Sequence, residues 1–359
     1  MRDVIRQLDA WTAGGTAAAL ATVVGVARSA PRPPGAKLAV SAAGDIAGAV
    51  SGGCVEGAVI EEAEAAMRDG QGRLLHFGIA DEEAWEVGLP CGGEIDVWVE
   101  PVREDSAAQA GFRAMTRDGD RGTLVTRLEP GGPPARLLVG ADGVHEGSLG
   151  SPALDAAAAT VAGELMWQER SGRQVVDGVP LFFDVAHPPP RLVIVGAVEI
   201  AVALVRLARD TGWRPYVIDP RRRFAAPERF PGAEAVLAQW PERAVAAIGG
   251  LDRATAVAVL THDPKIDDEA LMLALRSDAG YIGAMGSRFA QGRRRERLLA
   301  LGATEADLER IAAPIGLDLG GFEAEETALA VLAEIVALRR GRSGGRLSSS
   351  AGRIHDVIV

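Results

Sequence analysis

The sequence predicts an α/β protein with two parts, an N-terminal mixed α/β domain and a C-terminal Rossmann-like domain with a doubly wound parallel sheet. Residues 191–220 have the pattern of a strand, a helix and a second, parallel strand, which together form a right-handed βαβ unit. Short apolar runs alternate with segments of helical periodicity along most of the chain. The run His187-Pro-Pro-Pro190 predicts a linker between the two parts, since consecutive prolines fit neither helices nor central strands.

Each step of the βαβ unit has its own signal. The run 192–195 is short and apolar, which is typical of a buried parallel strand, and Gly196 allows the chain to turn sharply. Apolar residues recur at helical spacing from Val198 to Arg209, and Gly212 ends that helix as a left-handed cap. Asp219 ends the second strand, about 20 residues after the first glycine, where dinucleotide folds hold a ribose.

The glycine pattern of this unit is incomplete for dinucleotide binding. Only Gly196 of the three expected glycines is present. Val198 places a branched side chain where a pyrophosphate needs bare backbone. Glu199 places a carboxylate at a helix N-terminus that would otherwise attract phosphate. The sequence therefore predicts the Rossmann fold and argues against its usual use with NAD or NADP.

The predicted first domain spans residues 1–188 and has its core at residues 1–102. An amphipathic helix, Val4 to Trp11, opens this core, and a second helix starts near Val55. The strands expected in the core are residues 21–26, 37–40, 46–50, 73–77 and 94–100.

Residues 103–188 carry a weaker pattern, which is compatible with an extension of the same sheet. The elements expected there are strands at 122–128, 135–139 and 179–185 and an Ala-rich helix at 152–170. No internal repeat is evident in the chain.

The predicted second domain spans residues 189–341, and the Gly/Ser/Arg-rich tail 342–359 is expected to be mobile. Thr304 and Asp307 have the spacing of a capping box at the start of a helix. The elements expected beyond the βαβ unit are strands at 256–260 and 281–284 and helices at 267–276, 287–301, 304–311 and 324–340.

Composition excludes several classes of protein. With a net charge of −11 and 4% aromatic residues, the chain lacks the basic face and stacking rings of a nucleic-acid binder. Two cysteines are too few for a disulfide-stapled secreted scaffold. No apolar run reaches the ~20 residues of a membrane helix. Asp3 and Asp9 interrupt the start of the chain, which argues against a signal peptide, and we expect a cytoplasmic protein.

Polar residues follow several strands of the predicted second domain. In open α/β sheets ligands bind beyond the carboxyl ends of the strands, so these side chains could face one crevice, and Arg221 could hold a phosphate there. The structural alternatives are a turn cap for the acid, a solvated surface for the arginine and a satisfied loop position for the histidine. The candidate residues are Gly196, Asp219, Arg221, His262, Asp263 and Ser287.

The two cysteines lie beside glycines. Cys54 follows Gly53 and precedes a predicted helix, and Cys91 precedes Gly92. Glycine uncovers the neighbouring thiol, and a helix N-terminus favours thiolate. The alternatives are a buried small residue or a zinc site, which stays incomplete because His76 is the only nearby histidine. A soft metal or a sulfur-bearing cofactor suits one or two thiolates better. With no general base close in sequence, we assign no catalytic residue.

Several motifs are similar to those of the XdhC/CoxI family. In the first domain they are Ser29-Ala-Pro-Arg-Pro-Pro-Gly-Ala36, Gly48-Ala-Val-Ser-Gly-Gly-Cys-Val-Glu-Gly57 and Gly88-Leu-Pro-Cys-Gly-Gly-Glu-Ile-Asp96. In the second they are Asp219-Pro-Arg221, Phe230-Pro231, Leu260-Thr-His-Asp263, Tyr281-Ile-Gly-Ala-Met-Gly-Ser-Arg288 and Ala313-Pro-Ile-Gly-Leu-Asp-Leu-Gly320. Many family members have Gly-Ala-Gly-His after the first Rossmann strand, where this chain has Gly196-Ala-Val-Glu199.

The resemblance implies a role in the maturation of molybdenum hydroxylases such as xanthine dehydrogenase and carbon monoxide dehydrogenase. Members of the family are thought to bind the molybdopterin cofactor, protect it during sulfuration and pass it to the apo-enzyme. Cys54 and Cys91 match the family's cysteine positions and would face molybdenum. The implied partners are an apo molybdenum hydroxylase and a cysteine desulfurase-type sulfurtransferase.

We expect the site in the cleft between the two domains, with the strand-end groups of the second domain at the pterin, phosphate or nucleotide end of the cofactor. Two other functions stay open from the sequence. One is an NAD(P)-dependent oxidoreductase, and the other is a docking scaffold that touches no cofactor. Both a monomer and a homodimer are compatible with the sequence.

Overall fold

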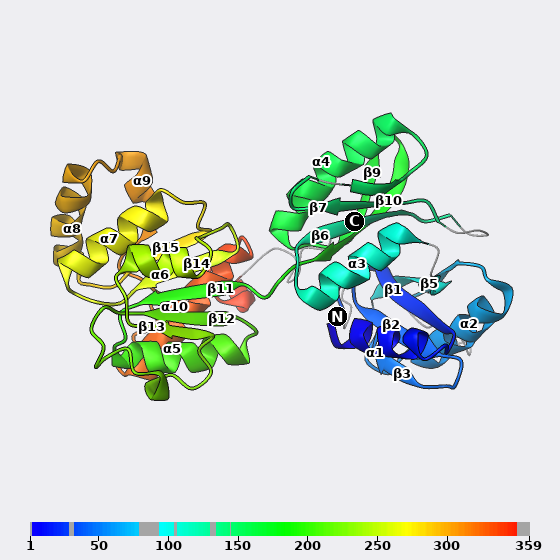
Figure 1. Cartoon of the computed structure of the whole chain (residues 1–359), viewed down its shortest axis with the longest axis horizontal. Coiled ribbons are helices and arrows are strands. Elements are labelled where there is room, and N and C mark those ends of the chain that lie inside the picture. The colour runs from blue at the N-terminus through cyan, green and yellow to red at the C-terminus, as the bar shows by residue number, and fades with distance from the viewer. Residues whose placement is uncertain are drawn as a thin grey trace. The chain divides into compact units, whose positions relative to one another are not determined.

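The computed structural model describes residues 2–28, 32–78, 93–103, 106–129, 134–143 and 145–349. The chain divides into two compact units, with the boundary in the sequence between Pro188 and Pro189. Figure 1 shows the elements of both units with their labels. No helix in the described part of the chain is long and apolar enough to cross a membrane.

The first half of the first unit, residues 2–103, is a five-stranded antiparallel sheet with the strand order β3-β2-β1-β5-β4. Helix α1 precedes the first strand, and α2 connects the third strand to the fourth. Buried Val59 and Ala63 of α2 pack on the sheet, as the predicted helical spacing requires. The elements are α1 (Arg2–Ala13), β1 (Ala18–Ala27), β2 (Lys37–Ser41), β3 (Ile46–Gly48), α2 (Glu56–Asp69), β4 (Arg73–Phe77) and β5 (Glu94–Pro101).

The second half of the first unit, residues 106–188, repeats this architecture. Its own sheet has the order β8-β7-β6-β10-β9, which is the order of the first sheet, with helices at the same two places in the chain. The expectation that these residues extend the first sheet was therefore wrong, and so was the absence of a repeat. The elements are α3 (Ala107–Asp118), β6 (Gly122–Arg127), β7 (Arg136–Gly140), β8 (His145–Ser148), α4 (Pro152–Gln168), β9 (Gly172–Val176) and β10 (Val179–Ala186).

The repeat extends to individual residues. Lys37 to Val50 corresponds to Arg136 to Leu149 at a constant spacing. Gly48 and Gly147, which are equivalent, have φ of 85° and 93°. A Cβ at Gly48 would lie 2.2 Å from the carbonyl oxygen of Lys37, and a Cβ at Gly147 would lie 2.3 Å from that of Arg136. Both halves therefore need glycine here for the same physical reason, a strand that passes too close for a side chain.

Two reciprocal ion pairs join the halves. Lys37 of the first half binds Asp184 of the second, and Arg136 of the second half binds Glu100 of the first. All four side chains are almost fully buried. The hydrophobic cluster beside them also draws on both halves and consists of Val24, Trp98, Phe182 and Leu128. The two sheets thus share an interior that combines apolar contacts with paired charges.

The second unit contains a six-stranded parallel sheet with the order β13-β12-β11-β14-β15-β16. Numbered along this unit the order is 3-2-1-4-5-6, the arrangement of a Rossmann fold, as the sequence predicted. The order in which strands are added to the sheet reverses between β11 and β14, although these two strands are parallel. The strands are β11 (Arg191–Val195), β12 (Arg214–Ile218), β13 (Ala235–Leu237), β14 (Thr255–Val259), β15 (Tyr281–Ala284) and β16 (Ile311–Ala312).

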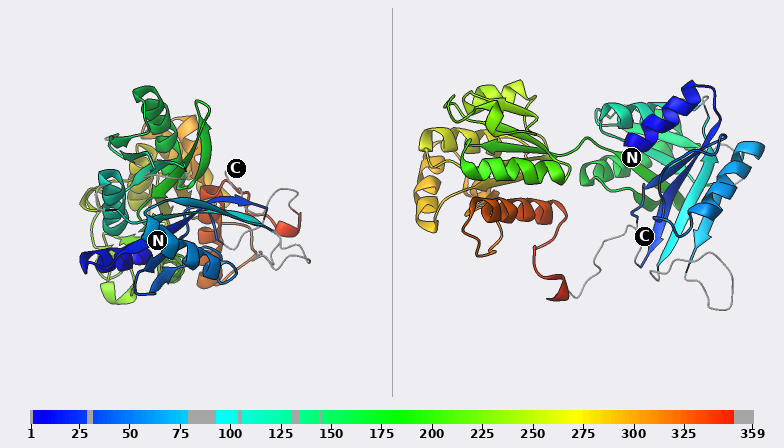
Figure 2. Two further views of the ribbon diagram at one scale, coloured as in Figure 1. Left: turned by 90° about the vertical axis from the view of Figure 1, so that its right-hand side faces the viewer. Right: turned by 90° about the horizontal axis from the view of Figure 1, so that it is seen from below.

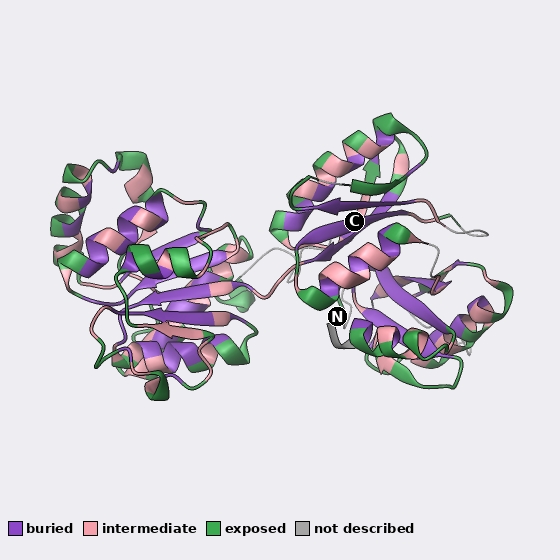
Figure 3. Ribbon diagram, in the orientation of Figure 1, coloured by how far each residue is buried: buried purple, intermediate pink, exposed green. Residues whose placement is uncertain are grey.

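Helices cover both faces of this sheet. Helices α5 and α10 lie side by side on one face (Figure 2), and α6, α7 and α8 pack on the other. The four central strands β11, β12, β14 and β15 are buried almost throughout, the edge strands β13 and β16 are half-buried, and the helices expose their outer surfaces (Figure 3). The helices are α5 (Glu199–Asp210), α6 (Pro241–Ala247), α7 (Pro264–Leu275), α8 (Arg288–Ala300), α9 (Glu305–Glu309) and α10 (Ala324–Arg339).

Local signals in the second unit behave as predicted. Gly212 has φ of 82° just after α5, and Thr304 forms a capping box with Asp307 at the start of α9. Short elements were missed because a few residues carry too little periodicity. Those elements are β8, β9, β13, β16 and α6, together with the longer helix α3. The tail residues 350–359 lie outside the described part of the chain.

The ion pairs between the halves lead to a stability prediction. Replacing Lys37 with Met should lower the free energy of unfolding of the first unit by about 3–5 kcal/mol, because it leaves the Asp184 carboxylate buried without its partner. The double variant Lys37→Met/Asp184→Leu should recover most of this loss. Calorimetry of the full chain measures both changes.

A matched control removes an exposed cation from the same unit. The Arg68–Glu64 pair is solvent-accessible, so Arg68→Met should cost less than about 1 kcal/mol. A loss in Lys37→Met no larger than in this control would contradict the proposed importance of the buried pairs.

Candidate functional site

Three connections of the chain start from one end of the first sheet. Strands β1, β3 and β4 run in one direction, and β2 and β5 run in the other, because each neighbouring pair is antiparallel. The β1–β2 connection, the β3–α2 loop and the β4–β5 connection therefore all lie at this end. These connections contain the three motifs that carried the family resemblance in the first domain.

The β3–α2 loop presents Cys54. The thiol is free and the residue is exposed, directly before helix α2. Gly52 and Gly53 have φ of 90° and 122°, which residues with side chains rarely adopt. A Cβ at either glycine would meet no atom within 4 Å, so the space beside the thiol is open. The predicted residues Cys91 and Gly92 lie outside the described part of the chain.

The carboxylate of Glu56 organises this loop. It accepts hydrogen bonds from the N–H groups of Val50 (3.2 Å), Ser51 (2.8 Å), Gly52 (2.8 Å) and Gly53 (2.7 Å) and from the Ser51 hydroxyl group. Burial raises the pKa of Glu56, but the hydrogen bonds from Ser51, Gly52 and Gly53 outweigh burial and lower it to about 2. The N–H groups before α2, where the sequence suggested a thiolate or a ligand, are thus already bound to a carboxylate of the chain itself.

The second half contains a structural counterpart of this loop without its chemistry. Asp155 accepts hydrogen bonds from Leu149 N–H and the Ser148 hydroxyl group, both at 2.7 Å, as Glu56 does from the equivalent region. Cys54 corresponds to Ala153 in this comparison, and the two glycines correspond to Ser151 and Pro152. The fold therefore requires the acid and tolerates other residues at the positions of the glycines and the cysteine.

The two halves also differ at the next connection. In the second half β9 and β10 are joined by a tight turn at Asp177 and Gly178, whereas β4 and β5 are joined by the longer segment 78–93. The first half has thus elaborated the same end of its sheet that carries Cys54.

His76 lies on β4 at this end of the sheet. Its Nδ1 is 2.7 Å from Asp96 Oδ1, and Asp96 Oδ2 accepts a hydrogen bond of 2.7 Å from Arg173 of the second half. A Cβ at Gly25 would come within 2.7 Å of Asp96 Oδ2, so the glycine makes room for the carboxylate. No group of three or more candidate metal ligands occurs among the described residues. Within those residues the zinc alternative gains no support.

At the carboxyl edge of the parallel sheet in the second unit, Asp219 is fully buried. Its carboxylate accepts a hydrogen bond from Ala197 N–H (2.9 Å) and forms a two-pronged ion pair with Arg221 at 2.8 and 2.7 Å. Burial opposes its ionisation, but the ion pair and the Ala197 hydrogen bond hold the pKa of Asp219 below its ordinary value. Gly196 is needed for packing, because a Cβ there would lie 2.4 Å from the Thr261 side chain.

The remaining predicted residues of this edge have different surroundings. Asp263 caps α7 by accepting a hydrogen bond from Lys265 N–H (3.0 Å), and Ser287 caps α8 by accepting one from Ala290 N–H (3.2 Å). His262 is exposed, and its side chain has no hydrogen bond or ion pair with any residue that the structure describes. Of the predicted polar groups, this imidazole is the one without a structural task.

Sequence reasoning missed two residues that shape these loops. Glu56 was visible as an acid in the first turn of a helix after two glycines, a pattern that resembles a capping arrangement. Arg229 donates hydrogen bonds from Nη1 to the carbonyl oxygens of Ala197 (2.9 Å) and Phe224 (2.7 Å) and so ties two strand-end loops together. No local pattern marks Arg229, because its bond to Ala197 joins residues 32 positions apart in the sequence.

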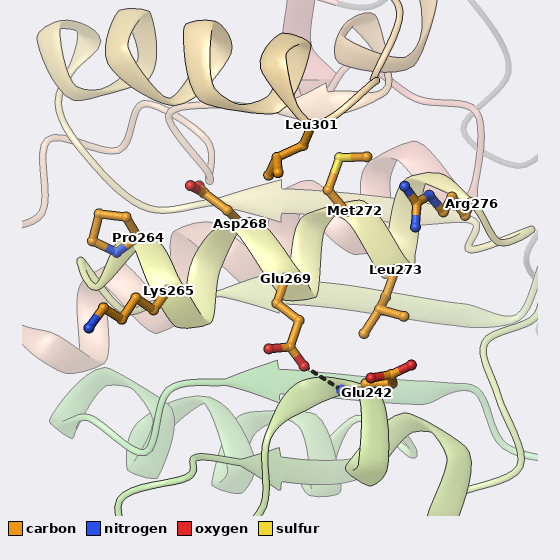
Figure 4. A pocket seen from close by; sticks show the side chains of 9 residues that line it. All are labelled: Glu242, Pro264, Lys265, Asp268, Glu269, Met272, Leu273, Arg276 and Leu301. Atoms are coloured by element: carbon orange, nitrogen blue, oxygen red, sulfur yellow. Dashed lines mark hydrogen bonds between the residues drawn. The ribbon is translucent and has the colours of Figure 1, made fainter.

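A groove of about 520 Å³ lies on the helical face formed by α6, α7 and α8 (Figure 4). Met272 and Leu301 form its apolar part, and Glu269 accepts a hydrogen bond from Glu242 N–H (2.9 Å) beside it. None of the predicted site residues lines this groove.

Comparison with known proteins follows the same division of the chain. Residues 11–78 match the XdhC and CoxI family, and residues 192–335 match the XdhC Rossmann domain. The first match includes Cys54 and Glu56 and ends before Cys91.

Two curated relatives cover most of the chain. A probable xanthine dehydrogenase subunit from Bacillus subtilis (strain 168) is 28% identical over 93% of this chain and 96% of its own length. The molybdenum cofactor insertion chaperone PaoD of Escherichia coli (strain K12) is 29% identical over 90% of this chain and 84% of its own.

The crystal structure of a protein described as a xanthine dehydrogenase from Bacillus halodurans superimposes with a TM-score of 0.68 at 23% identity. The match covers 97% of this chain and 98% of the other. At this identity the likeness shows the shared fold.

The carboxyl edge of the parallel sheet leads to a prediction about dinucleotides. Asp219 is engaged by Arg221, and Val198 and Glu199 stand where a pyrophosphate would bind, so NAD and NADP should bind more weakly than about 1 mM. Isothermal titration calorimetry of the full chain with each dinucleotide measures this affinity. A dissociation constant in the micromolar range would instead support an oxidoreductase.

Proposed function

Because the chain belongs to the XdhC and CoxI family, we propose that it is an accessory protein for molybdenum hydroxylases of the xanthine dehydrogenase or carbon monoxide dehydrogenase type. In this proposal it binds the molybdenum cofactor as cargo, holds it while sulfur is added and delivers it to the apo-enzyme. The names of its relatives support the insertion of the cofactor and the link to xanthine dehydrogenase, since one is an insertion chaperone and the other a probable subunit of xanthine dehydrogenase.

The observation that carries the proposal is the exposed Cys54 thiol between two open glycines and a helix. Its counterpart in the second half is Ala153, so the fold itself does not need a thiol at this position. Thiolate sulfur is a soft ligand of the kind that soft and sulfur-rich metal centres prefer. We assign Cys54 to the molybdenum end of the cofactor, with Gly53 giving access, and we keep Cys91 and Gly92 as a proposed second contact.

The second unit supplies the other contacts in this proposal. Exposed His262 is free to donate or accept a hydrogen bond from a pterin, and Arg221 carries the charge that a phosphate needs. The inward-facing Asp219 then holds Arg221 in place. Gly196, Asp263 and Ser287 shape the loops around these groups.

Release is part of the same function. A carrier must let its cargo go, and one or two thiolates on glycine-rich loops provide fewer ligands than the four of a structural metal site. The proposed partners are the apo-hydroxylase, which receives the cofactor, and a cysteine desulfurase-type sulfurtransferase, which supplies sulfur. We place these steps in the cytoplasm.

The proposal predicts the molybdenum content of protein purified from molybdate-fed cells. Cys54→Ser should lower it at least about tenfold relative to wild type, because even outer-shell partners of a bound metal are worth that much. Mass spectrometry of the metal measures the content per chain.

The matched control is Ala153→Ser, which places the same hydroxyl group at the equivalent position of the second half and should leave the content unchanged. Equal molybdenum in wild type and Cys54→Ser would remove Cys54 from the function.

A further inference from the structure

The five hydrogen bonds that Glu56 accepts come from consecutive parts of one short loop. Four backbone N–H groups, from Val50 to Gly53, point at one carboxylate within 3.2 Å. Such a run of N–H groups is the kind of concavity that binds phosphates and other anions in many proteins. Here the chain fills it with its own side chain.

The hydrogen bonds continue from Glu56 to Cys54. The Ser51 hydroxyl group donates to Glu56 and accepts from the N–H groups of Cys54 (3.0 Å) and Val55 (3.1 Å). Ser51 is buried, whereas Cys54 is exposed. The backbone of Cys54 is therefore fixed through Ser51 to the carboxylate, while the thiol stays open to solvent.

We propose that Glu56 is a positioning residue for Cys54: it fixes the loop so that the thiol is presented, and it fills the anion-binding concavity so that this loop offers the cargo sulfur and no backbone anion site. The consequence for cargo binding rests on the proposed function, whereas the fixing of the loop does not. Phosphate and oxo groups of the cofactor then find no N–H cluster before α2, which keeps the complex reversible.

The second half shows that the acid at this position can serve the fold with fewer donors. Asp155 accepts hydrogen bonds from Leu149 N–H, the equivalent of Val50 N–H, and from the Ser148 hydroxyl group, whereas the position of Gly53 is held by Pro152, which has no N–H to donate. Glu56 reaches four N–H groups and a hydroxyl group. An acid at this position is thus enough for the fold, and glutamate adds the bonds that hold the two glycines next to the cysteine.

The test compares Glu56→Gln, Glu56→Asp and the control Asp155→Asn in the full chain. In Glu56→Gln the side chain loses its negative charge, and its NH2 group, which is a donor, faces backbone N–H groups that are also donors. Hydrogen exchange of the peptide from residues 50–57 should therefore become at least about tenfold faster, the factor that one hydrogen bond to a charged group represents. Glu56→Asp should give an intermediate rate, and Asp155→Asn should leave this peptide unchanged.

Molybdenum content in the same variants provides the functional result. We expect the order wild type, Glu56→Asp, Glu56→Gln from highest to lowest, with Asp155→Asn equal to wild type. Should Glu56→Gln fail to fold, Glu56→Asp alone must still show reduced content and faster exchange of this peptide.

The outcomes separate the two proposals. Unchanged exchange in Glu56→Gln overturns the positioning role. Faster exchange with wild-type molybdenum content overturns the link between the fixed loop and the cargo. A wild-type protein without molybdenum overturns the proposed function, while the exchange data still decide whether Glu56 fixes the loop.

Discussion

The carboxylate of Glu56 and the backbone N–H groups that surround it are the constraint on which the candidate site depends. The Glu56 carboxylate pairs the N–H groups of Val50, Ser51, Gly52 and Gly53 and the buried Ser51 hydroxyl group, so one acceptor fixes four consecutive residues of a glycine-rich loop. With it, the loop takes one conformation and Cys54 projects from it. The same interaction occupies the N–H groups that could otherwise bind an anion, which leaves the exposed thiol as the group that the proposed function uses.

The duplication of the first unit gives this site an internal reference. Both halves keep the buried cation, the glycine in the third strand and the acid at the start of the second helix, represented by Lys37 and Arg136, Gly48 and Gly147, and Glu56 and Asp155. These shared features belong to the fold. Features found in the first half alone are the cysteine, its two glycines and the long β4–β5 connection, and these are the features on which the proposed function rests.

Much of the fold was predictable because its signals are local. The apolar strand 192–195, the helical spacing up to Arg209 and the positive φ of Gly212 each depend on a few neighbouring residues. The repeat was also present in the sequence, where Lys37-Leu-Ala-Val and Arg136-Leu-Leu-Val begin the matching segments, but low identity concealed it. The second sheet of the first unit was misassigned because strand patterns do not specify which strands pair.

The candidate site was predictable only in part. Cys54 beside glycines and His262 after a strand were visible as motifs, and the structure leaves both exposed. The inward orientation of Asp219 was not visible, since it depends on Arg221 and on the Ala197 backbone in a folded loop. Glu56 was overlooked because an acid at a helix start usually has a simpler role with the helix dipole.

Native mass spectrometry of freshly isolated full-length protein tests the central claim most directly, because it weighs the chain together with whatever it carries. The account predicts a species heavier than the bare chain by the mass of a molybdenum-bearing pterin, present in wild type and absent when Cys54 is replaced by Ser. The account would be contradicted if only the bare chain were found in protein isolated from cells in which the hydroxylase matures.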